Sequence, residues 1–312
     1  MNFVLLFPGQ GSQKPGMARD LADAFPAARS VFDEADQAIG SGFSKVCFEG
    51  PAEELTLTHN AQPALLAHGA AVWAVTRQRL DGQVRAAAGH SLGEFTAYHA
   101  AGSIALGDAL RLVRRRGELM YDSGVKRPGA MAAILGDTNE PIEGICAKAT
   151  AEAGLVSPAN YNSPGQIVIS GEERGVERAM ELAKAAGAKR AIRLNVSGAF
   201  HSALMETALD GLSQAIASVS FANPRFPVYA NVNGDAVTTS DRGKQLLVQQ
   251  LTRPVRWTEE VQALASKYPD ATYVEMGPGS VLTGLVKKIA PTVKTMTCGT
   301  MAEVNQLLEL AA

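Results

Sequence analysis

The sequence has few cysteines, and none are arranged to bind a metal or to form a disulfide framework. Cys47, Cys146 and Cys298 are far apart, odd in number and include no C-x-x-C pair. Structural zinc sites and disulfide-rich secreted domains both need clustered or paired cysteines. We therefore expect reduced thiols, no metal and a cytoplasmic location.

Long apolar runs and a large excess of either charge are also missing. The apolar segment that ends at Phe7 lacks a basic leader and stops at Pro8-Gly9, which predicts a buried strand and not a signal peptide. No apolar run approaches the length of a membrane span. The net charge is only -2, whereas binding to nucleic-acid phosphates needs a dominant basic face. These absences argue against a membrane protein and against a general nucleic-acid binder.

The chain has the length and apolar content for a large core. With 312 residues, 46% of them apolar, it can hold one large domain or a large and a small one. Its first part alternates segments typical of strands and of helices, which predicts a largely parallel sheet with helices on its faces. The expected strands are 2–7 and 84–88, and the expected helices are 17–24, 26–39, 62–80, 94–101 and 108–122.

Residues 129 to 196 follow a different order. Strands are expected at 130–135, 156–161, 166–170 and 188–194, and helices at 140–153 and 173–186. This β-α-β-β-α-β order is ferredoxin-like. The sequence therefore predicts an α/β fold in which a small ferredoxin-like domain, 128–196, interrupts a large domain made of 1–127 and 197–312. In the second part of the large domain we expect helices near 204–218 and 241–251, strands near 228–231 and 272–276, and a helix after Gly279.

The most informative motif is the G-x-S-x-G sequence from Gly89 to Gly93, with Ser91 at its centre. It stands where a strand should pass into a helix, which is the context that a nucleophile elbow requires. Glycines at both ends allow a sharp turn that lifts the serine hydroxyl out of the fold. An incidental serine in an ordinary turn is the alternative, and the position between strand and helix favours a nucleophile.

A serine nucleophile needs a base, and the chain offers five histidines. His201 is the best candidate because it lies in a loop-like segment late in the chain, the order typical of an elbow serine and its base. No acidic residue stands out as the group that orients His201, and a backbone carbonyl can do so. The histidines at positions 59, 68, 90 and 99 are expected to be structural.

Arg116 points toward the core when its helix is drawn at about 100° per residue. A buried guanidinium must find an anion or a cavity, since an unpaired buried charge is very costly. The choice lies between an internal salt bridge to an Asp or Glu and a bidentate site for a substrate carboxylate.

The glycine-rich loop 9–12 lacks the lysine and the spacing of a P-loop and does not complete G-x-G-x-x-G, so nucleotide binding is not indicated. Its backbone amides can instead supply one donor of an oxyanion hole. The amide of Leu92, the residue after the nucleophile, can supply the other.

Several motifs, taken in order along the whole chain, resemble the malonyl-CoA:acyl carrier protein transacylase family. They are Phe7-Pro8-Gly9-Gln10-Gly11-Ser12-Gln13, Gln62-Pro63-Ala64, Gly89-His90-Ser91-Leu92-Gly93-Glu94, Arg116-Gly117, Gly198-Ala199-Phe200-His201-Ser202, Pro254-Val255-Arg256-Trp257 and Glu275-Met276-Gly277-Pro278-Gly279. The resemblance implies a large α/β-hydrolase-like domain interrupted by a small ferredoxin-like one. It also implies a monomer without metal or bound cofactor.

The family resemblance assigns the chemistry to particular residues. Ser91 would carry the acyl group, and His201 would activate first the serine and then the incoming thiol. The backbone amides of Gln10 and Leu92 would form the oxyanion hole. Arg116 would hold the malonyl carboxylate.

Three further residues take supporting roles by the same resemblance. Gln250 would fix His201 through its backbone carbonyl, and Gln62 would line the substrate pocket. Phe200 matches an A-F-H form that accompanies malonyl preference over methylmalonyl in related polyketide acyltransferase domains, where a bulky ring would clash with the added methyl group. Such shape exclusion is worth about 1–3 kcal/mol.

The resemblance implies transfer of malonyl from malonyl-CoA, through Ser91, to the phosphopantetheine thiol of an acyl carrier protein in fatty acid synthesis. The segment Val196–Phe200 also resembles the polyketide form, so a trans-acting acyltransferase of a polyketide synthase is an alternative. A serine hydrolase of acyl thioesters and a non-catalytic acyl-CoA or carrier-binding module are further alternatives. Candidate basic surfaces for an acidic carrier are Lys126-Arg127, Lys189-Arg190 with Arg193, and Lys287-Lys288.

Overall fold

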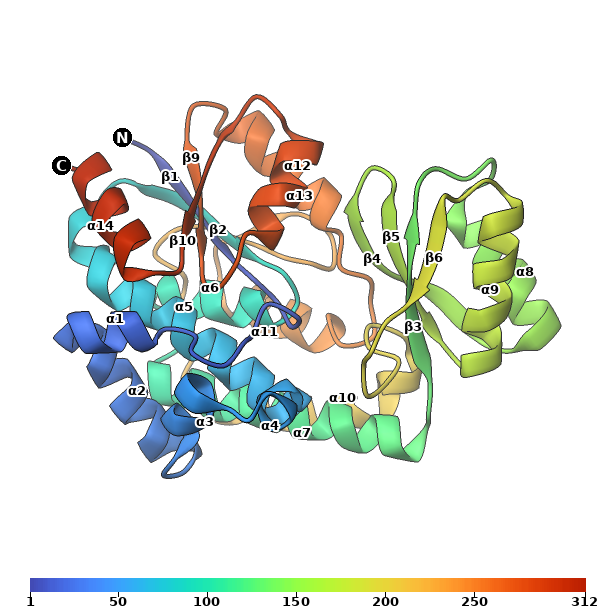
Figure 1. Ribbon diagram of the computed structural model, residues 1–312, viewed down its shortest axis with the longest axis horizontal. Coiled ribbons are helices and arrows are strands. Elements are labelled where there is room, and N and C mark those ends of the chain that lie inside the picture. The colour runs from blue at the N-terminus through green and yellow to red at the C-terminus, as the bar shows by residue number, and fades with distance from the viewer.

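The computed structural model describes residues 1–312 and contains two separate sheets. In the larger sheet all neighbouring strands are parallel except the last pair, which is antiparallel. Its strands, in spatial order, are β10 (Lys294–Cys298), β9 (Thr272–Met276), β1 (Phe3–Phe7), β2 (Val84–Gly89), β7 (Val228–Tyr229) and β8 (Ala236–Val237). The mixed α/β class expected from the alternating pattern is confirmed (Figure 1).

Both faces of β1, in the middle of the larger sheet, are buried, as its continuous apolar sequence requires. Val4 and Leu6 face a cluster of apolar residues from α12 (Trp257–Lys267) and α13 (Val281–Ile289). Phe3, Leu5 and Phe7 face the main core, formed with the other helices of this part. These are α1 (Arg19–Ala24), α2 (Pro26–Ile39), α3 (Phe43–Glu49), α4 (Ala52–Thr56), α5 (Thr58–Leu80), α6 (Leu92–Ala100), α7 (Leu106–Lys126), the 3₁₀ helix η1 (Ala203–Ala208), α10 (Leu209–Ser218), α11 (Ser240–Gln249) and α14 (Met301–Leu310).

The smaller sheet is antiparallel, with strand order β4-β5-β3-β6. Its elements are β3 (Ala130–Leu135), α8 (Ile142–Ala153), β4 (Val156–Ser163), β5 (Gln166–Gly171), α9 (Glu173–Ala185) and β6 (Arg190–Arg193). This is the β-α-β-β-α-β order that the sequence predicts. Figure 1 shows it beside the larger sheet, with α8 and α9 on one side. We propose that residues 128–196 form an inserted small domain.

Strand β4 joins the two parts directly. Tyr161 donates its backbone N–H to the carbonyl of Val255 at 2.8 Å, and Val255 donates to the carbonyl of Ala159 at 2.8 Å. This bridge holds Asn160, on the edge of the small sheet, against the segment that leads into α12. The smaller sheet is thereby placed over the carboxyl ends of the larger one, where the chain forms a cavity.

Some expected elements differ in their bounds. The helix expected to begin at Gln62 starts at Thr58, so Pro63 lies inside α5. Pro63 has no N–H to give to the carbonyl of His59, and the guanidinium of Arg114 donates to that carbonyl instead at 3.2 Å. The first turns of the helix expected at 204–218 are 3₁₀, in η1. The elements that have no counterpart among those expected from the sequence are α3, α4, α12, β8, β10 and α14.

The carboxyl ends of β1 and β2 meet at the elbow, and the glycines there have no space for a side chain. A Cβ atom on Gly93 would lie 2.0 Å from the carbonyl oxygen of Phe7. A Cβ atom on Gly89 would lie 2.0 Å from the backbone of Gly93. This close packing sets the loop after β1 directly against the turn that carries Ser91.

We expect Gly93→Ala to lower the free energy of unfolding by at least about 2 kcal/mol, because the added methyl group meets backbone that no rotamer change can move. Denaturation in urea measures the effect. Gly284→Ala is the matched control: this glycine is also helical, but it is exposed and a Cβ atom there meets nothing within 4 Å. The control should be neutral or stabilising by up to about 1 kcal/mol. Equal effects of the two substitutions would contradict the packing argument.

Candidate active site

Ser91 occupies the sharp turn between β2 and α6. Its backbone angles are φ 52° and ψ -104°, a conformation that is strained for a residue with a side chain. The amide oxygen Oδ1 of Asn231 accepts a hydrogen bond from the Ser91 N–H at 2.7 Å, which holds the turn from behind. The side chain is partly exposed and lines a cavity of about 270 Å³.

His201 lies next to this serine although 110 residues separate the two along the chain. Its Nε2 is 2.8 Å from the Ser91 Oγ, and its Nδ1 is 2.8 Å from the backbone carbonyl oxygen of Gln250. A carbonyl only accepts, so Nδ1 carries the proton and Nε2 is free to accept from the serine hydroxyl. Burial, followed by the charge of Arg116, lowers the pKa of His201 to about 3. The imidazole is therefore neutral at pH 7 and able to take a proton.

The other four histidines contact other groups. His68 Nε2 lies 2.8 Å from the carbonyl oxygen of Gly299. His99 Nδ1 lies 3.0 Å from the carbonyl oxygen of Ile104. His90, next to the serine in sequence, turns to the Asn162 side chain at 2.8 Å, and His59 packs edge-on against Tyr121. Only His201 lies within hydrogen-bonding distance of Ser91.

Arg116 is 1% exposed and its guanidinium reaches the site from α7. It donates to Gln62 Oε1 at 2.6 Å, to Gln250 Oε1 at 2.9 Å and to the Ser91 Oγ at 3.2 Å. None of these partners is a carboxylate, so the salt bridge considered in the sequence analysis is not formed. Burial lowers the pKa of Arg116 to about 10, and the charge of Glu94 opposes this shift. The side chain remains a cation without a directly bound anion.

Gln10, in the loop after β1, and Leu92, at the start of α6, supply the two amides considered for an oxyanion hole, and both residues line the cavity. Neither N–H donates a hydrogen bond within the protein. A chain of side chains links the Gln10 loop to the guanidinium: Gln10 Oε1 accepts from Thr58, whose hydroxyl accepts from Gln62, which in turn accepts from Arg116. These motifs therefore converge on one place.

Two expectations about the cavity have different outcomes. Phe200, 6% exposed, is part of the cavity wall beside His201. Gln62, expected to line the pocket, is 1% exposed and lies behind Arg116, where its amide oxygen holds the guanidinium. The helix that begins at Thr58 places Gln62 in the interior. In the structure its side chain thus contacts Arg116 and is not part of the cavity wall.

A polar network behind the serine was not predicted from the sequence. The Gln250 side-chain amide donates to the Ser91 carbonyl oxygen at 3.0 Å and to the Glu94 carboxylate at 2.7 Å. Asn231 donates to the Gly89 carbonyl oxygen at 2.8 Å and to Glu260 Oε1 at 2.9 Å. One signal was present: Glu94 is a single acid in the otherwise apolar sequence that begins α6.

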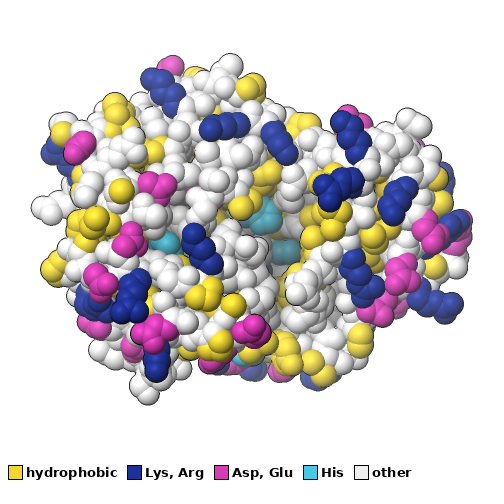
Figure 2. All heavy atoms as spheres, viewed as in Figure 1, with side chains coloured by type: hydrophobic (Ala, Val, Ile, Leu, Met, Phe, Trp, Pro, Cys, Tyr) yellow, Lys and Arg dark blue, Asp and Glu magenta, His cyan; other side chains and the backbone are white.

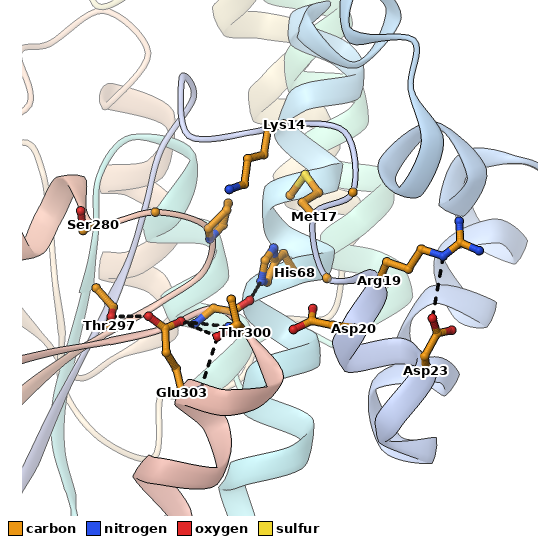
Figure 3. A pocket seen from close by; sticks show the side chains of 15 residues that line it. Lys14, Met17, Arg19, Asp20, Asp23, His68, Ser280, Thr297, Thr300 and Glu303 are labelled. Carbon is orange, nitrogen blue, oxygen red and sulfur yellow. Dashed lines mark hydrogen bonds and ion pairs between the residues drawn. The ribbon is translucent and has the colours of Figure 1, made fainter.

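A larger cavity, of about 760 Å³, lies between the loop after β1 and the start of α14 (Figure 3). Its acidic groups already have partners. Asp20 accepts from the backbone N–H of Met301 at 2.7 Å, Asp23 pairs with Arg19 at 3.8 Å, and Glu303 caps α14 through Thr300. The smaller cavity, by contrast, contains a serine, a neutral histidine and an arginine with no paired carboxylate. It is therefore the candidate active site.

The surface around the site is hollowed between the two parts of the molecule, and histidine side chains are visible in the hollow (Figure 2). Lysine and arginine side chains lie on both sides of it. No group of three or more His, Cys, Asp or Glu side chains is placed to hold a metal ion. Each helix is either too short or too polar to span a bilayer.

The chain matches known proteins along most of its length. Residues 4–304 match the acyl transferase domain family. The chain is 47% identical to the malonyl CoA-acyl carrier protein transacylase of Bacillus subtilis over 94% of this chain and 92% of that protein. It is 43% identical to the protein of the same name from Escherichia coli over 99% of both chains.

Solved structures are similar over the whole chain. The crystal structure of acyl-carrier-protein-S-malonyltransferase from Bartonella henselae has a TM-score of 0.94 and 43% identity, covering 100% of this chain and 99% of that one. A malonyl-transacylase in complex with a type II polyketide synthase acyl carrier protein has a TM-score of 0.94 and 42% identity, covering 99% and 100% of the two chains.

Proposed function

The chain belongs to the acyl transferase family of malonyl-CoA:acyl carrier protein transacylases, and we propose that it transfers malonyl from malonyl-CoA to the phosphopantetheine thiol of an acyl carrier protein. The observation that carries the proposal is the buried Arg116 guanidinium, 3.2 Å from the Ser91 Oγ and without a bound carboxylate. A cation in that position fits an acyl group that itself ends in a carboxylate.

In the first half-reaction, His201 Nε2 takes the hydroxyl proton as the Ser91 Oγ attacks the thioester carbonyl. The amides of Gln10 and Leu92 donate to the oxygen that becomes negative. The bond from carbon to the sulfur of coenzyme A then breaks, and the imidazolium returns the proton to the leaving thiolate. Throughout, Arg116 holds the malonyl carboxylate, and malonyl remains as an ester on Ser91.

In the second half-reaction, His201 takes the proton of the carrier thiol, whose sulfur attacks the malonyl ester. The bond from carbon to Ser91 Oγ breaks, and the serine regains its proton from the imidazolium. The backbone carbonyl of Gln250 keeps the Nδ1–H of His201 in place during both steps. Each step uses groups of this chain and the two thiols alone. Phe200 beside the acyl group would disfavour a methyl branch on the α-carbon.

An acidic carrier needs a basic surface near the site. Of the basic clusters singled out in the sequence, two members are already engaged: Arg193 pairs with Glu173 at 2.6 Å and Arg127 donates to a backbone carbonyl. The remaining members form no ion pair and are proposed docking groups: Lys126, Lys189, Arg190, Lys287 and Lys288. Because all three cysteines are free and lie apart, we also propose a cytoplasmic location.

Intact-mass measurement tests the proposal. The protein mixed with malonyl-CoA should gain one malonyl group, and adding a holo acyl carrier protein should move that group to the carrier. Loss of the group to water at the same rate without a carrier would favour a serine hydrolase, and no adduct at all would favour a non-catalytic binding module. Offering carriers of fatty acid and of polyketide synthesis separately distinguishes the two pathways.

The pH dependence of turnover tests the state of His201. Because burial lowers its pKa to about 3, the imidazole should stay unprotonated well below its ordinary pKa of about 6.5. At saturating malonyl-CoA we therefore expect kcat to be independent of pH between about 5 and 7. Steady-state rates in overlapping buffers measure this. A fall in kcat with an inflection near 6.5 would contradict the neutral, desolvated imidazole.

A further inference from the structure

The charge of Arg116 is balanced by a carboxylate that the guanidinium does not contact directly. The guanidinium contacts amide and hydroxyl oxygens only, while the side-chain amide of Gln250 bridges it to a carboxylate. Gln250 Oε1 accepts from Arg116 at 2.9 Å, and Gln250 Nε2 donates to Glu94 Oε2 at 2.7 Å. The negative end of the amide dipole thus faces the cation and the positive end faces the anion. This leaves the guanidinium open toward the acyl site.

Glu94 is fully buried on α6, and it shares this interior with a second buried acid, Glu260. Oε2 of Glu94 carries its two hydrogen bonds, whereas Oε1 has no partner. The groups that face Glu94 come from its own helix, from α7, from α12 and from two loops: Tyr98, Arg116, Glu260, Asn231 and Gln250.

One cation among two buried carboxyl groups can balance only one negative charge. Burial, and then the neighbouring Glu94, raises the pKa of Glu260 well above its ordinary value, which favours its neutral form. Burial also raises the pKa of Glu94, to about 7, although hydrogen bonds and the charge of Arg116 favour its ionised form. Glu94 is therefore the group whose charge can change near neutral pH.

We propose that Glu94 is the resident counter-charge of Arg116: its ionised form balances the guanidinium while the acyl site is empty and takes up a proton when the carboxylate of a substrate binds the guanidinium. The inference rests on the proposed function and adds a positioning residue to it. The proton comes from solvent and adds to the Glu94 carboxylate, where Oε1 carries no hydrogen bond that protonation would break. No other bond forms or breaks in this step.

Proton uptake by Glu94 makes the binding of malonyl-CoA weaker as the pH rises. Binding that takes up a proton is strongest below the pKa of the free site, about 7, and weakens as pH rises above it. The KM for malonyl-CoA should therefore rise by up to about tenfold per pH unit above pH 7. An uncharged acyl-CoA, which brings no carboxylate, should show no such dependence.

Proton uptake during acylation is the direct test. The protein is mixed with malonyl-CoA at pH 7 in a lightly buffered solution with an indicator dye, and the malonyl adduct is counted by intact mass. Since Glu94 is about half ionised at its pKa, we expect about half a proton per adduct. An adduct formed without proton uptake overturns the inference alone. Absence of the adduct overturns the proposed function and the inference with it.

Two matched variants test whether Glu94 is the group that takes up the proton. Glu94→Gln keeps an oxygen that accepts from Gln250 but cannot ionise, so uptake should disappear and the KM for malonyl-CoA should become flat above pH 7. Glu260→Gln alters the other buried acid, whose raised pKa favours the neutral form, and should keep the uptake. Proton uptake that persists in Glu94→Gln overturns the inference. So does a wild-type KM for malonyl-CoA that is flat from about pH 6.5 to 8.5, and this measurement needs no variant.

Discussion

Ser91→Ala should abolish the malonyl adduct and lower the transfer rate by at least about 10³-fold, with no loss of folding. The hydroxyl is the atom that His201 contacts at 2.8 Å, and no other side-chain hydroxyl or thiol lies within hydrogen-bonding distance of that imidazole. The oxyanion donors and Arg116 stay in place, so malonyl-CoA should still bind. Intact-mass spectra after mixing with malonyl-CoA, and rates of carrier malonylation, measure the two effects.

Ser170→Ala is the control for this substitution. Ser170 is fully buried in β5, and its hydroxyl has no hydrogen-bond partner, so the same loss of one oxygen occurs away from the site. The control should keep full adduct formation. An adduct of normal yield in Ser91→Ala would show that another group carries the acyl chain and would remove the basis of the proposed mechanism.

The parts of the fold that sequence could predict are those with a local signal. The strand before Ser91 and the β-α-β-β-α-β order follow from apolar patterns and turn residues that act over a few positions. The start of α5 did not, because Pro63 suggested a helix start there. What allows Pro63 inside the helix is Arg114, more than fifty residues away, whose guanidinium satisfies the carbonyl that proline leaves free.

The residues of the candidate site also divide into those that a local sequence pattern predicts and those that it does not. The G-x-S-x-G turn is local, and the inward direction of Arg116 follows from helical periodicity. The Gln250 side chain could not be found in this way, because its importance comes from four groups, Arg116, Ser91, Glu94 and Asn231, that three separate segments bring around one amide. Gln62 likewise was expected on the pocket wall, and its place behind Arg116 depends on where α5 begins.

Arg116→Met should separate function from stability. Methionine fills much of the same volume but cannot bind a carboxylate, so kcat/KM for malonyl-CoA should fall by about 30- to 3000-fold, equivalent to about 2–5 kcal/mol. An uncharged acyl-CoA such as acetyl-CoA should lose far less, which reverses the preference of the protein. Competition between the two thioesters, read as the two adduct masses on Ser91, measures this preference directly.

In Arg116→Met the free energy of unfolding should change less than the activity toward malonyl-CoA. Removing one partner of a buried salt bridge lowers stability by about 3–5 kcal/mol. Arg116, however, contacts no carboxylate. Glu94, with a pKa of about 7, can take up a proton when the cation is gone. Methionine leaves the buried amide oxygens of Gln62 and Gln250 without their donor, so we expect urea denaturation to show a moderate loss of about 1–3 kcal/mol, less than a broken salt bridge would cost. Arg115→Met, one position earlier and exposed, is the control and should change neither property. A strongly destabilised Arg116→Met with unchanged malonyl preference would assign Arg116 to the core and not to the substrate.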